Sequence, residues 1–385
     1  GDISTASSIK DPVEFMRDVA YALSDLRCIC ALTGGFDSRM VAACMNYVYP
    51  VDCFISGERD DSSEIRCAVH AAKEGGLNMK VVKPHFPKIS DGLIRSTFYG
   101  NGAYRQRIST AGYRIISFRE QLKEEGYQVL LTGDAGDMHK DFWLVQDFPS
   151  YWSRKTHVER FYKRRLEVIN YSEYLGDVLK SKYSELQSEQ IEYLYSLKKA
   201  RNSQSYLMFG WFGAWVASAV GRAHYDNPVP YNPLQEIDLV RYSYQMLPKG
   251  KRFNYFLRQM TTNANPKMAR AVTEYKTTAS SEKVYMFRDA FVQIYATGIR
   301  ALRFVFRRLT GKTYFTDTIN ETDLESKIRE TTLAKESLFW AKEKGYIRSD
   351  VELLAIPYFL LERIMNLFLV KTELDNSLER DCMES

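Results

Sequence analysis

The stretch Cys28-Ile-Cys-Ala-Leu-Thr-Gly-Gly-Phe-Asp-Ser-Arg39 is the most informative part of this chain of 385 residues. Its apolar first half is typical of a β-strand, and a Gly-Gly turn leads from it into a segment that is compatible with a helix from Ser38. Gly34 and Gly35 allow backbone angles closed to other residues and leave no side chain between the main-chain amides and an anion. A helix opening at Ser38 points unpaired N–H groups and its positive dipole end at the same spot. The stretch therefore predicts a phosphate-binding loop.

A second loop of the same kind, Val129-Leu-Leu-Thr-Gly-Asp-Ala-Gly-Asp137, ends another apolar run in glycines and two carboxylates. One Gly-Gly turn after a strand is an ordinary structural element, so this second loop is what favours phosphate binding. In a doubly wound sheet the strand ends meet at a single carboxyl edge, where ligands bind. Asp37, Asp134 and Asp137 would supply the oxygen ligands that Mg²⁺ prefers beside a triphosphate.

These two loops carry a resemblance to known families. Thr33 to Ser38 resembles the S-G-G-x-D-S pyrophosphate loop of the N-type ATP pyrophosphatases, with Thr33 in place of the first Ser. The second loop resembles the G-D-G-A-D-E motif in the synthetase domain of the asparagine synthetase family, with Met138 in place of the last Glu. The resemblance implies an adenine nucleotide alpha-hydrolase-like fold that uses ATP and Mg²⁺. It also implies a set of nucleotide-binding residues: Leu32, Thr33, Gly34, Gly35, Asp37, Ser38, Ser56, Gly133 and Asp134.

Two later segments extend this resemblance to about Ser280. In Asp226-Asn-Pro-Val-Pro-Tyr-Asn-Pro233, Asp226 stands where the family has its active-site Glu, and Pro228 stands where it has Arg. Val272 to Thr278 resembles the stretch whose lysine contacts the acyl-adenylate. The resemblance implies that Lys276 stabilises charge on the α phosphate and that Asp226 holds or deprotonates the attacking amine. By sequence alone, a lysine in a Thr-rich stretch is usually a solvated surface residue, and an Asp before Asn-Pro can simply initiate a turn.

The chemistry of such a site follows from which phosphates of ATP it binds. Amide formation from a carboxylate is blocked because oxide is a poor leaving group, so the acid must first be activated. Main-chain amides and Mg²⁺ that hold the β and γ phosphates make pyrophosphate the leaving group and the α phosphorus the target. We therefore expect AMP and pyrophosphate as products.

The hydrophobic pattern predicts an α/β fold, a doubly wound parallel sheet, followed by an all-helical C-terminal part. Strand-like runs at 28–32, 51–55, 79–82 and 128–131 alternate with helix-length segments such as 62–75 and 111–126. From about residue 145 the strand signals vanish, and the segments 193–199, 206–220 and 237–246 are typical of helices.

We divide the chain into three parts on this pattern: 1–144 as the PP-loop ATP pyrophosphatase core, 145–280 as a helical region on the substrate side, and 281–385 as a helical extension. The extension carries an aromatic stripe formed by Phe287, Phe291, Phe304 and Phe306. Such a stripe is far more often core or a partner-binding face than a cofactor site.

Composition excludes several other classes of protein. A hydrophobic content of 45% with 26% charged residues is typical of a globular protein, and a net charge of +5 does not favour nucleic acid as a partner. No apolar run approaches the ~18 residues of a membrane helix, so we expect no membrane partner. The six cysteines show no zinc or redox spacing, and we expect free thiols in a cytoplasmic protein.

We therefore expect an ATP-dependent, amide-forming ligase of asparagine-synthetase-like type. Its substrates would be a small-molecule or carrier-linked carboxylate other than aspartate, and ammonia or an amine. These residues contain no glutaminase domain, so the amine would come from solution, a partner or a missing segment. The alternatives are a degenerate nucleotide-binding homologue that serves as a scaffold, and another PP-loop adenylating enzyme such as a tRNA-modifying one.

Overall fold

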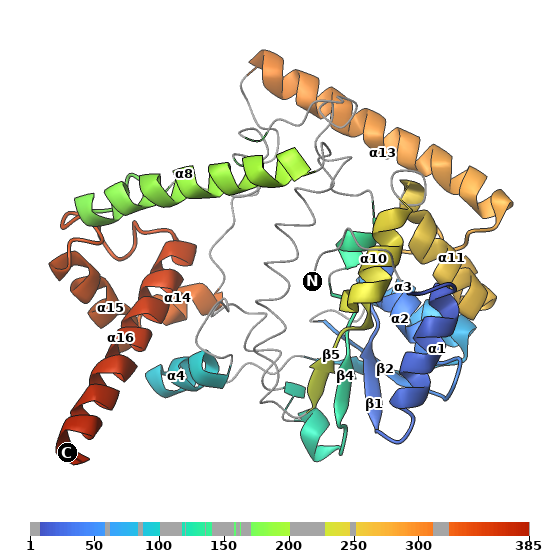
Figure 1. Ribbon diagram of the computed structural model, residues 1–385, viewed down its shortest axis with the longest axis horizontal. Helices are drawn as coiled ribbons and strands as arrows, with labels where there is room; N and C mark the ends of the chain where they lie inside the picture. Colours follow the sequence, from blue (N-terminus) through green and yellow to red (C-terminus); the bar gives the residue numbers. More distant parts are fainter. Residues whose placement is uncertain are drawn as a thin grey trace.

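A computed structural model of the chain describes residues 8–57, 62–83, 88–100, 118–119, 121–134, 136–140, 158, 162, 171–200, 228–246, 252–310 and 323–384. Its five strands form one all-parallel sheet in the order β3-β2-β1-β4-β5 (Figure 1). The strands are β1 (Cys28–Ala31), β2 (Asp52–Ser56), β3 (Asn78–Val82), β4 (Val129–Leu131) and β5 (Val229–Tyr231). The first four confirm the strands that the sequence predicts.

Alternating side chains of these strands enter two separate cores. Cys28 and Cys30 of β1 lie in the larger core, whereas Ile29 between them lies in the core on the opposite face. The register places Cys30 beside Cys53 and Leu131, which enter the same core. Because successive side chains of a strand point to opposite faces, apolar residues on both sets of positions bury both faces of the sheet.

β5 corrects the expectation that no strand follows residue 145. Val229 donates its N–H to the oxygen of Gln128 at 2.9 Å, and Thr132 donates to the oxygen of Tyr231 at 3.0 Å. Pro230 has no N–H, but β5 is the last strand of the sheet, where the outward side of the strand needs no donor. A three-residue edge strand with a proline gives no hydrophobic alternation from which it could be predicted.

Helices cover both faces of the sheet, which confirms the predicted α/β fold with a helical C-terminal part. The helices are α1 (Pro12–Ala22), α2 (Asp37–Met45), α3 (Ser63–Gly75), α4 (Asp91–Gly100), η1 (Gly136–His139), α8 (Asp177–Ala200), η4 (Pro233–Gln235), α10 (Ile237–Gln245), η5 (Arg252–Asn254), α11 (Tyr255–Ala264), α12 (Pro266–Arg270), α13 (Lys283–Thr310), α14 (Asp323–Arg329), α15 (Thr332–Glu343) and α16 (Tyr358–Glu384). The predicted helices at 62–75, 193–199 and 237–246 correspond to α3, part of α8 and α10. The predicted helix at 206–220 lies outside the described residues.

The helices pack in two groups. α1, α2, α3, α11 and α12 contribute to the core on one face of the sheet, and Phe118 and Leu122 cover the other face. A separate core joins α4 and the start of α8 to α14, α15 and α16, which Figure 1 shows apart from the sheet. The division of the chain at 144 and 280 stays a prediction.

Two other expectations concern the described residues only. Cys28, Cys30, Cys44, Cys53 and Cys67 are free thiols, and all but Cys67 are buried. Within the described helices, none is long and apolar enough to cross a membrane.

Candidate functional site

The two glycine loops meet at the carboxyl ends of β1 and β4. A Cβ atom added to Gly133 would collide with the backbone nitrogen of Ser38, and one added to Gly136 would collide with the carboxyl group of Asp37. Both positions therefore require glycine for the loops to approach each other. The approach brings together the two loops that the sequence predicts to share one nucleotide.

Hydrogen bonds shape the first loop around its hydroxyl groups. The backbone nitrogen of Thr33 donates to Ser38 Oγ at 2.9 Å, and the two hydroxyl oxygens lie 2.8 Å apart. Gly35 N donates to Thr33 Oγ1 at 3.4 Å. The hydroxyl group of Thr33 thus makes hydrogen bonds within the loop, at the position where the motif that the loop resembles has Ser.

α2 starts in this loop without a side-chain cap. Its N-cap residue is Phe36, which makes no capping hydrogen bond, and Asp37 and Ser38 are its first residues. The first N–H groups of a helix have no partner within the helix, and together with the dipole they favour an anion. An uncapped helix after a buried Gly-Gly turn fits a phosphate group.

A lysine that the sequence did not single out lies between two of the predicted metal ligands. Lys140 Nζ forms a short ion pair with Asp37 Oδ2 and lies 3.2 Å from Asp137 Oδ1. Asp37 Oδ1 is buried and has no hydrogen-bond partner among the described residues. The carboxylate of Asp37 is therefore satisfied on one oxygen only.

Burial and the ion pair have opposite effects on the pKa values of Asp37 and Lys140. It raises the pKa of Asp37 to about 6, against the opposing effect of Lys140. Burial acts to lower the pKa of Lys140, but Asp37 and Asp137 outweigh it and hold that pKa above its usual value. Both groups thus bind their protons more tightly than in water, and the lysine stays charged.

The fit to a metal ion depends on few oxygens. Across the described residues, no group of three or more His, Cys, Asp or Glu side chains is arranged to hold a metal ion. Asp134 is exposed at the rim of the second loop, while Asp37 and Asp137 share Lys140. The unpartnered Oδ1 of Asp37 is the atom that best fits Mg²⁺.

Lys276 sits in a tight turn that packs on the phosphate loop. Glu274 donates its N–H to Gly34 O at 3.0 Å, and Lys276 N donates to Thr273 O at 2.9 Å. The rings of Phe36 and Tyr275 stack with centroids 6.2 Å apart. The turn therefore places Lys276 beside the loop from which it is separated by more than two hundred residues of sequence.

The backbone of Lys276 is itself unusual. Its φ of 62° is in the left-handed region, which costs a non-glycine residue about 1–2 kcal/mol. Its side chain is exposed. Strain of this kind persists where the surrounding structure imposes it, and such residues cluster at functional sites.

Arg39 fixes the segment that leads into this turn. Its guanidinium is fully buried, and it donates to the backbone oxygens of Ala271 and Val272 at 2.5 and 3.2 Å. Burial lowers the pKa of Arg39 to about 10. Arg39 follows directly after the phosphate loop, but its burial could not be predicted, because arginines on helices usually face solvent.

The remaining predicted residues lie around the same edge of the sheet. Leu32 is buried, and its N–H donates to Phe54 O at 2.8 Å. Ser56 is exposed at the end of β2. Asn232 donates a side-chain hydrogen bond to Asp134 O, which ties the segment after β5 to the second loop. Asp226 lies outside the described residues, so its predicted role stays a prediction.

The comparisons with known proteins give one match. The family model described as asparagine synthase matches residues 17–269. The match includes both loops and ends before Lys276. No curated protein gives a significant match to the chain.

Proposed function

Because the chain belongs to the asparagine synthase family, we propose that it activates a carboxylate as an acyl-adenylate and transfers the acyl group to ammonia or an amine. A ligase-type function that uses ATP follows from the family. The observation that carries the finer proposal is the meeting of three segments: the phosphate loop, the second loop and the turn of Lys276.

In the first step, an oxygen of the substrate carboxylate attacks the α phosphorus of ATP, and the bond to the leaving pyrophosphate breaks. The main-chain amides of Gly34 and Gly35 and the start of α2 would bind the β and γ phosphates. Lys276 would stabilise the charge on the α phosphate and on the carboxyl oxygen.

In the second step, the amine attacks the carbonyl carbon, the carbon–oxygen bond to AMP breaks, and the amine loses a proton. Asp226 would accept that proton, a role whose contribution is typically ~10²- to 10⁴-fold. The final products are an amide, AMP and pyrophosphate.

Mg²⁺ would neutralise triphosphate charge in a site that already contains several carboxylates. The carboxyl group of Glu274 lies beside Gly35, in addition to the aspartates of the two loops. Asp37 and Asp137, with Asp134 at the rim, would hold the ion. Lys140 would then give up its position at Asp37 or remain as a second cation.

The substrate class rests on departures from the family pattern. Pro228 stands where the family has Arg, and Met138 stands where it has Glu. We therefore favour a small-molecule or carrier-linked carboxylate other than aspartate. The acceptor of the acyl group would be ammonia or an amine.

One observation favours a second function, that of a nucleotide-binding scaffold without turnover. Lys140 pairs with two of the carboxylates that would hold Mg²⁺. A protein in which this lysine permanently replaces the metal would bind nucleotide without activating a carboxylate.

Exchange of labelled pyrophosphate into ATP separates the two functions. The ligase predicts exchange that requires Mg²⁺ and one carboxylate from a broad panel. Lys276→Ala should lower the exchange rate much more than the affinity for ATP. ATP binding without exchange across the whole panel would refute the ligase and support the scaffold.

A further inference from the structure

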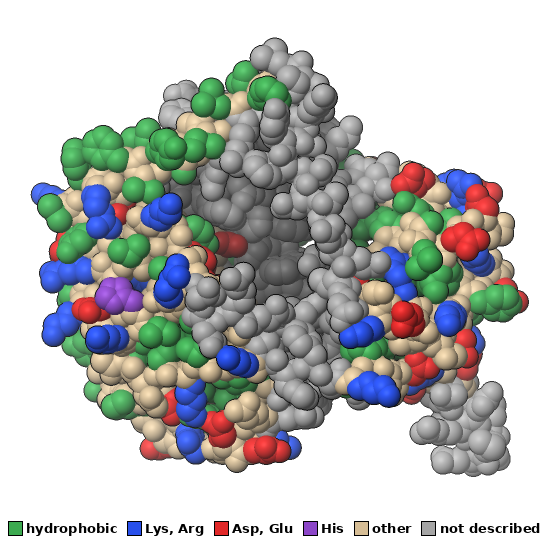
Figure 2. Space-filling model, turned by 180° about the vertical axis from the view of Figure 1, so that it is seen from behind, with side chains coloured by type: hydrophobic (Ala, Val, Ile, Leu, Met, Phe, Trp, Pro, Cys, Tyr) green, Lys and Arg blue, Asp and Glu red, His purple; other side chains and the backbone are tan. Residues whose placement is uncertain are grey.

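α13 exposes a continuous stripe of apolar side chains. Positions three and four residues apart share one face of a helix. On α13 the residues at such positions are between 60% and 72% exposed: Val284, Phe287, Phe291, Ile294, Tyr295 and Leu302. Figure 2 shows hydrophobic side chains gathered along this helix. Single exposed apolar residues are normal on a protein surface, but a contiguous patch marks a site of interaction.

The charged residues of α13 are almost all basic. The helix contains six basic residues, Lys283, Arg288, Arg300, Arg303, Arg307 and Arg308, and its single acidic residue is Asp289. Asp289 is buried and ion-paired with Arg258. The helix therefore combines an apolar stripe with an excess of positive charge.

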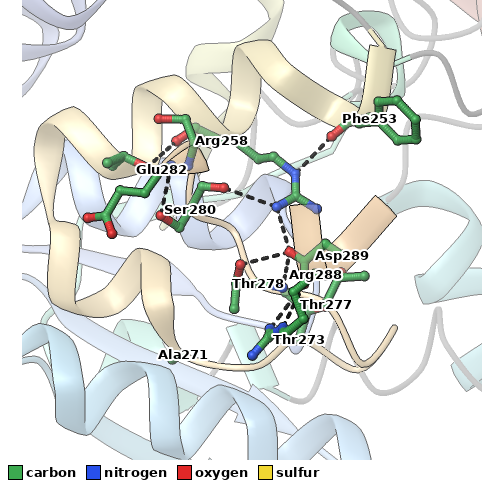
Figure 3. A network of polar contacts seen from close by, with 12 residues as sticks. Phe253, Arg258, Ala271, Thr273, Thr277, Thr278, Ser280, Glu282, Arg288 and Asp289 are labelled. Atoms are coloured by element: carbon green, nitrogen blue, oxygen red, sulfur yellow. Dashed lines mark hydrogen bonds and ion pairs between the residues drawn. The ribbon is translucent and has the colours of Figure 1, made fainter. Parts of the chain in front are cut away.

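Buried hydrogen bonds hold the start of α13 in place (Figure 3). Asp289 Oδ2 accepts from Arg258 Nη1, from Thr278 N and from Thr278 Oγ1, each at 2.8 Å. Arg258 Nη1 also donates to Ser280 O at 3.0 Å. These bonds fix α13 to α11 and to the segment that follows Lys276. The helix that carries the exposed stripe is therefore held in place by buried contacts at its start.

We propose that α13 docks on the surface of an anionic lipid bilayer. A long helix with aromatic and aliphatic residues on one stripe and an excess of basic residues lies in the plane of such an interface. Its apolar stripe would enter the boundary between headgroups and acyl chains, and the net positive charge of the helix would attract it to anionic headgroups. The proposal concerns the surface of a membrane, and it differs from the sequence-based expectation of no membrane partner, which rests on the lack of a membrane-spanning run.

The charge of α13 decides between possible occupants. Pairing of α13 with the same helix of a second copy would bring two strongly positive segments together, which is unfavourable. A nucleic acid would satisfy the basic residues but would leave Val284, Ile294 and Leu302 facing polar phosphates. An anionic bilayer complements both the charge and the apolar stripe.

Flotation of the full chain with vesicles tests this proposal. We expect the protein to float with vesicles that contain phosphatidylglycerol and phosphatidylcholine, and to remain free with vesicles of phosphatidylcholine alone. Binding should weaken as salt is raised from about 0.1 M to about 1 M, because the screening length falls from about 10 Å to about 3 Å. ATP is not required, so the result does not depend on the proposed function.

Substitutions assign the binding to α13. Phe287→Ser/Phe291→Ser should lower the partition onto anionic vesicles by about tenfold or more, because two aromatic rings no longer leave water. Phe287→Leu/Phe291→Leu should retain most of the binding. Phe339→Ser, at an exposed phenylalanine of α15, is the matched control and should bind as the parent does.

Three outcomes would overturn the proposal. One is the absence of flotation with either type of vesicle. Another is equal flotation with both types, which would show that charge plays no part. The third is concentration-dependent dimerisation in analytical ultracentrifugation that Phe287→Ser/Phe291→Ser abolishes, because the stripe would then be an interface between copies of the chain.

Discussion

Asp37 at the edge of the sheet is half-buried and Asp289 in α13 is fully buried; both face a cation, but their pKa values shift in opposite directions. Asp289 accepts three hydrogen bonds on Oδ2, and Arg288 Nη2 lies 3.0 Å from Oδ1. Burial acts to raise the pKa of Asp289, but Arg258 and Thr278 outweigh it and lower that pKa. At Asp37, burial outweighs Lys140, and Oδ1 has no partner in the described part of the chain.

The difference separates a carboxylate whose hydrogen bonds all come from the protein from one that still has an oxygen free for a ligand. Buried polar groups in folded proteins are normally hydrogen-bonded, and each exception needs an explanation. Asp289 satisfies this rule with groups of the protein alone. Asp37 does not, and it lies where the two glycine loops meet. We infer that folding depends on Asp289 and that ligand binding depends on Asp37.

Asp37→Asn gives the largest expected effect on activity. The amide keeps the shape of the side chain but removes the charge that would hold Mg²⁺, so pyrophosphate exchange should fall about 10²- to 10³-fold, the usual loss for one electrostatic contact at a reacting centre. Stability at neutral pH should not fall, because the ionised form is disfavoured by burial. Asp238→Asn, at a surface ion pair with Arg241, is the control. Undiminished exchange in Asp37→Asn would remove Asp37 from the site.

Asp289→Asn should instead lower the stability of the protein. It leaves the buried guanidinium of Arg258 without a counter-charge, so the free energy of unfolding in urea should fall by about 3 kcal/mol. Glu282→Gln, which removes an exposed pair with Arg270, should cost less than about 1 kcal/mol. Equal losses in the two variants would contradict the structural role of Asp289.

A double-mutant cycle measures what Lys140 contributes at Asp37. Lys140→Met alone leaves a carboxylate in a buried place without its cation, so it should destabilise the protein. Asp37→Asn/Lys140→Met removes both charges and should recover much of that loss, with a coupling of about 1–3 kcal/mol. Additive effects in urea unfolding would mean that the ion pair has no net strength.

Sequence patterns predict the surroundings of Asp37 better than those of Asp289. β1 and β4 are buried on both faces and are therefore apolar throughout, and parallel strand ends share an edge, so the meeting of the two loops could be predicted. Lys140 could not, since a lysine after a loop is usually solvated. Its spacing from Asp137, one helical turn away, was the available signal. The pairing of Asp289 with Arg258 joins positions on two helices, which no local pattern reveals.

Lys276→Gly tests whether strain marks the ligand side of the molecule. Glycine adopts a positive φ freely, so the substitution should raise the free energy of unfolding by about 1 kcal/mol, after allowance for the greater entropy of the unfolded chain. The exchange rate should fall as in Lys276→Ala. Asn254→Gly, at a φ of 58°, should gain less, because Asn tolerates this region. A loss of stability in Lys276→Gly would show that the lysine side chain holds the turn.

The pH dependence of stability should differ in sign between the two carboxylates. The pKa of Asp289 is lowered on folding, so its contribution is present above the unfolded value of about 3.9 and is lost as the pH falls through the folded pKa. The gap in unfolding free energy between the parent and Asp289→Asn should therefore narrow below about pH 4. The pKa of Asp37 is raised to about 6, so its contribution is present below the unfolded value and is lost as the pH rises through 6. In metal-free buffer, Asp37→Asn should thus gain on the parent as the pH rises from about 4 to above 6. Urea unfolding across this range measures the difference in unfolding free energy between the parent and each variant. If that difference changed with pH in the same direction for both variants, the two carboxylates would not differ in the way their hydrogen bonds indicate.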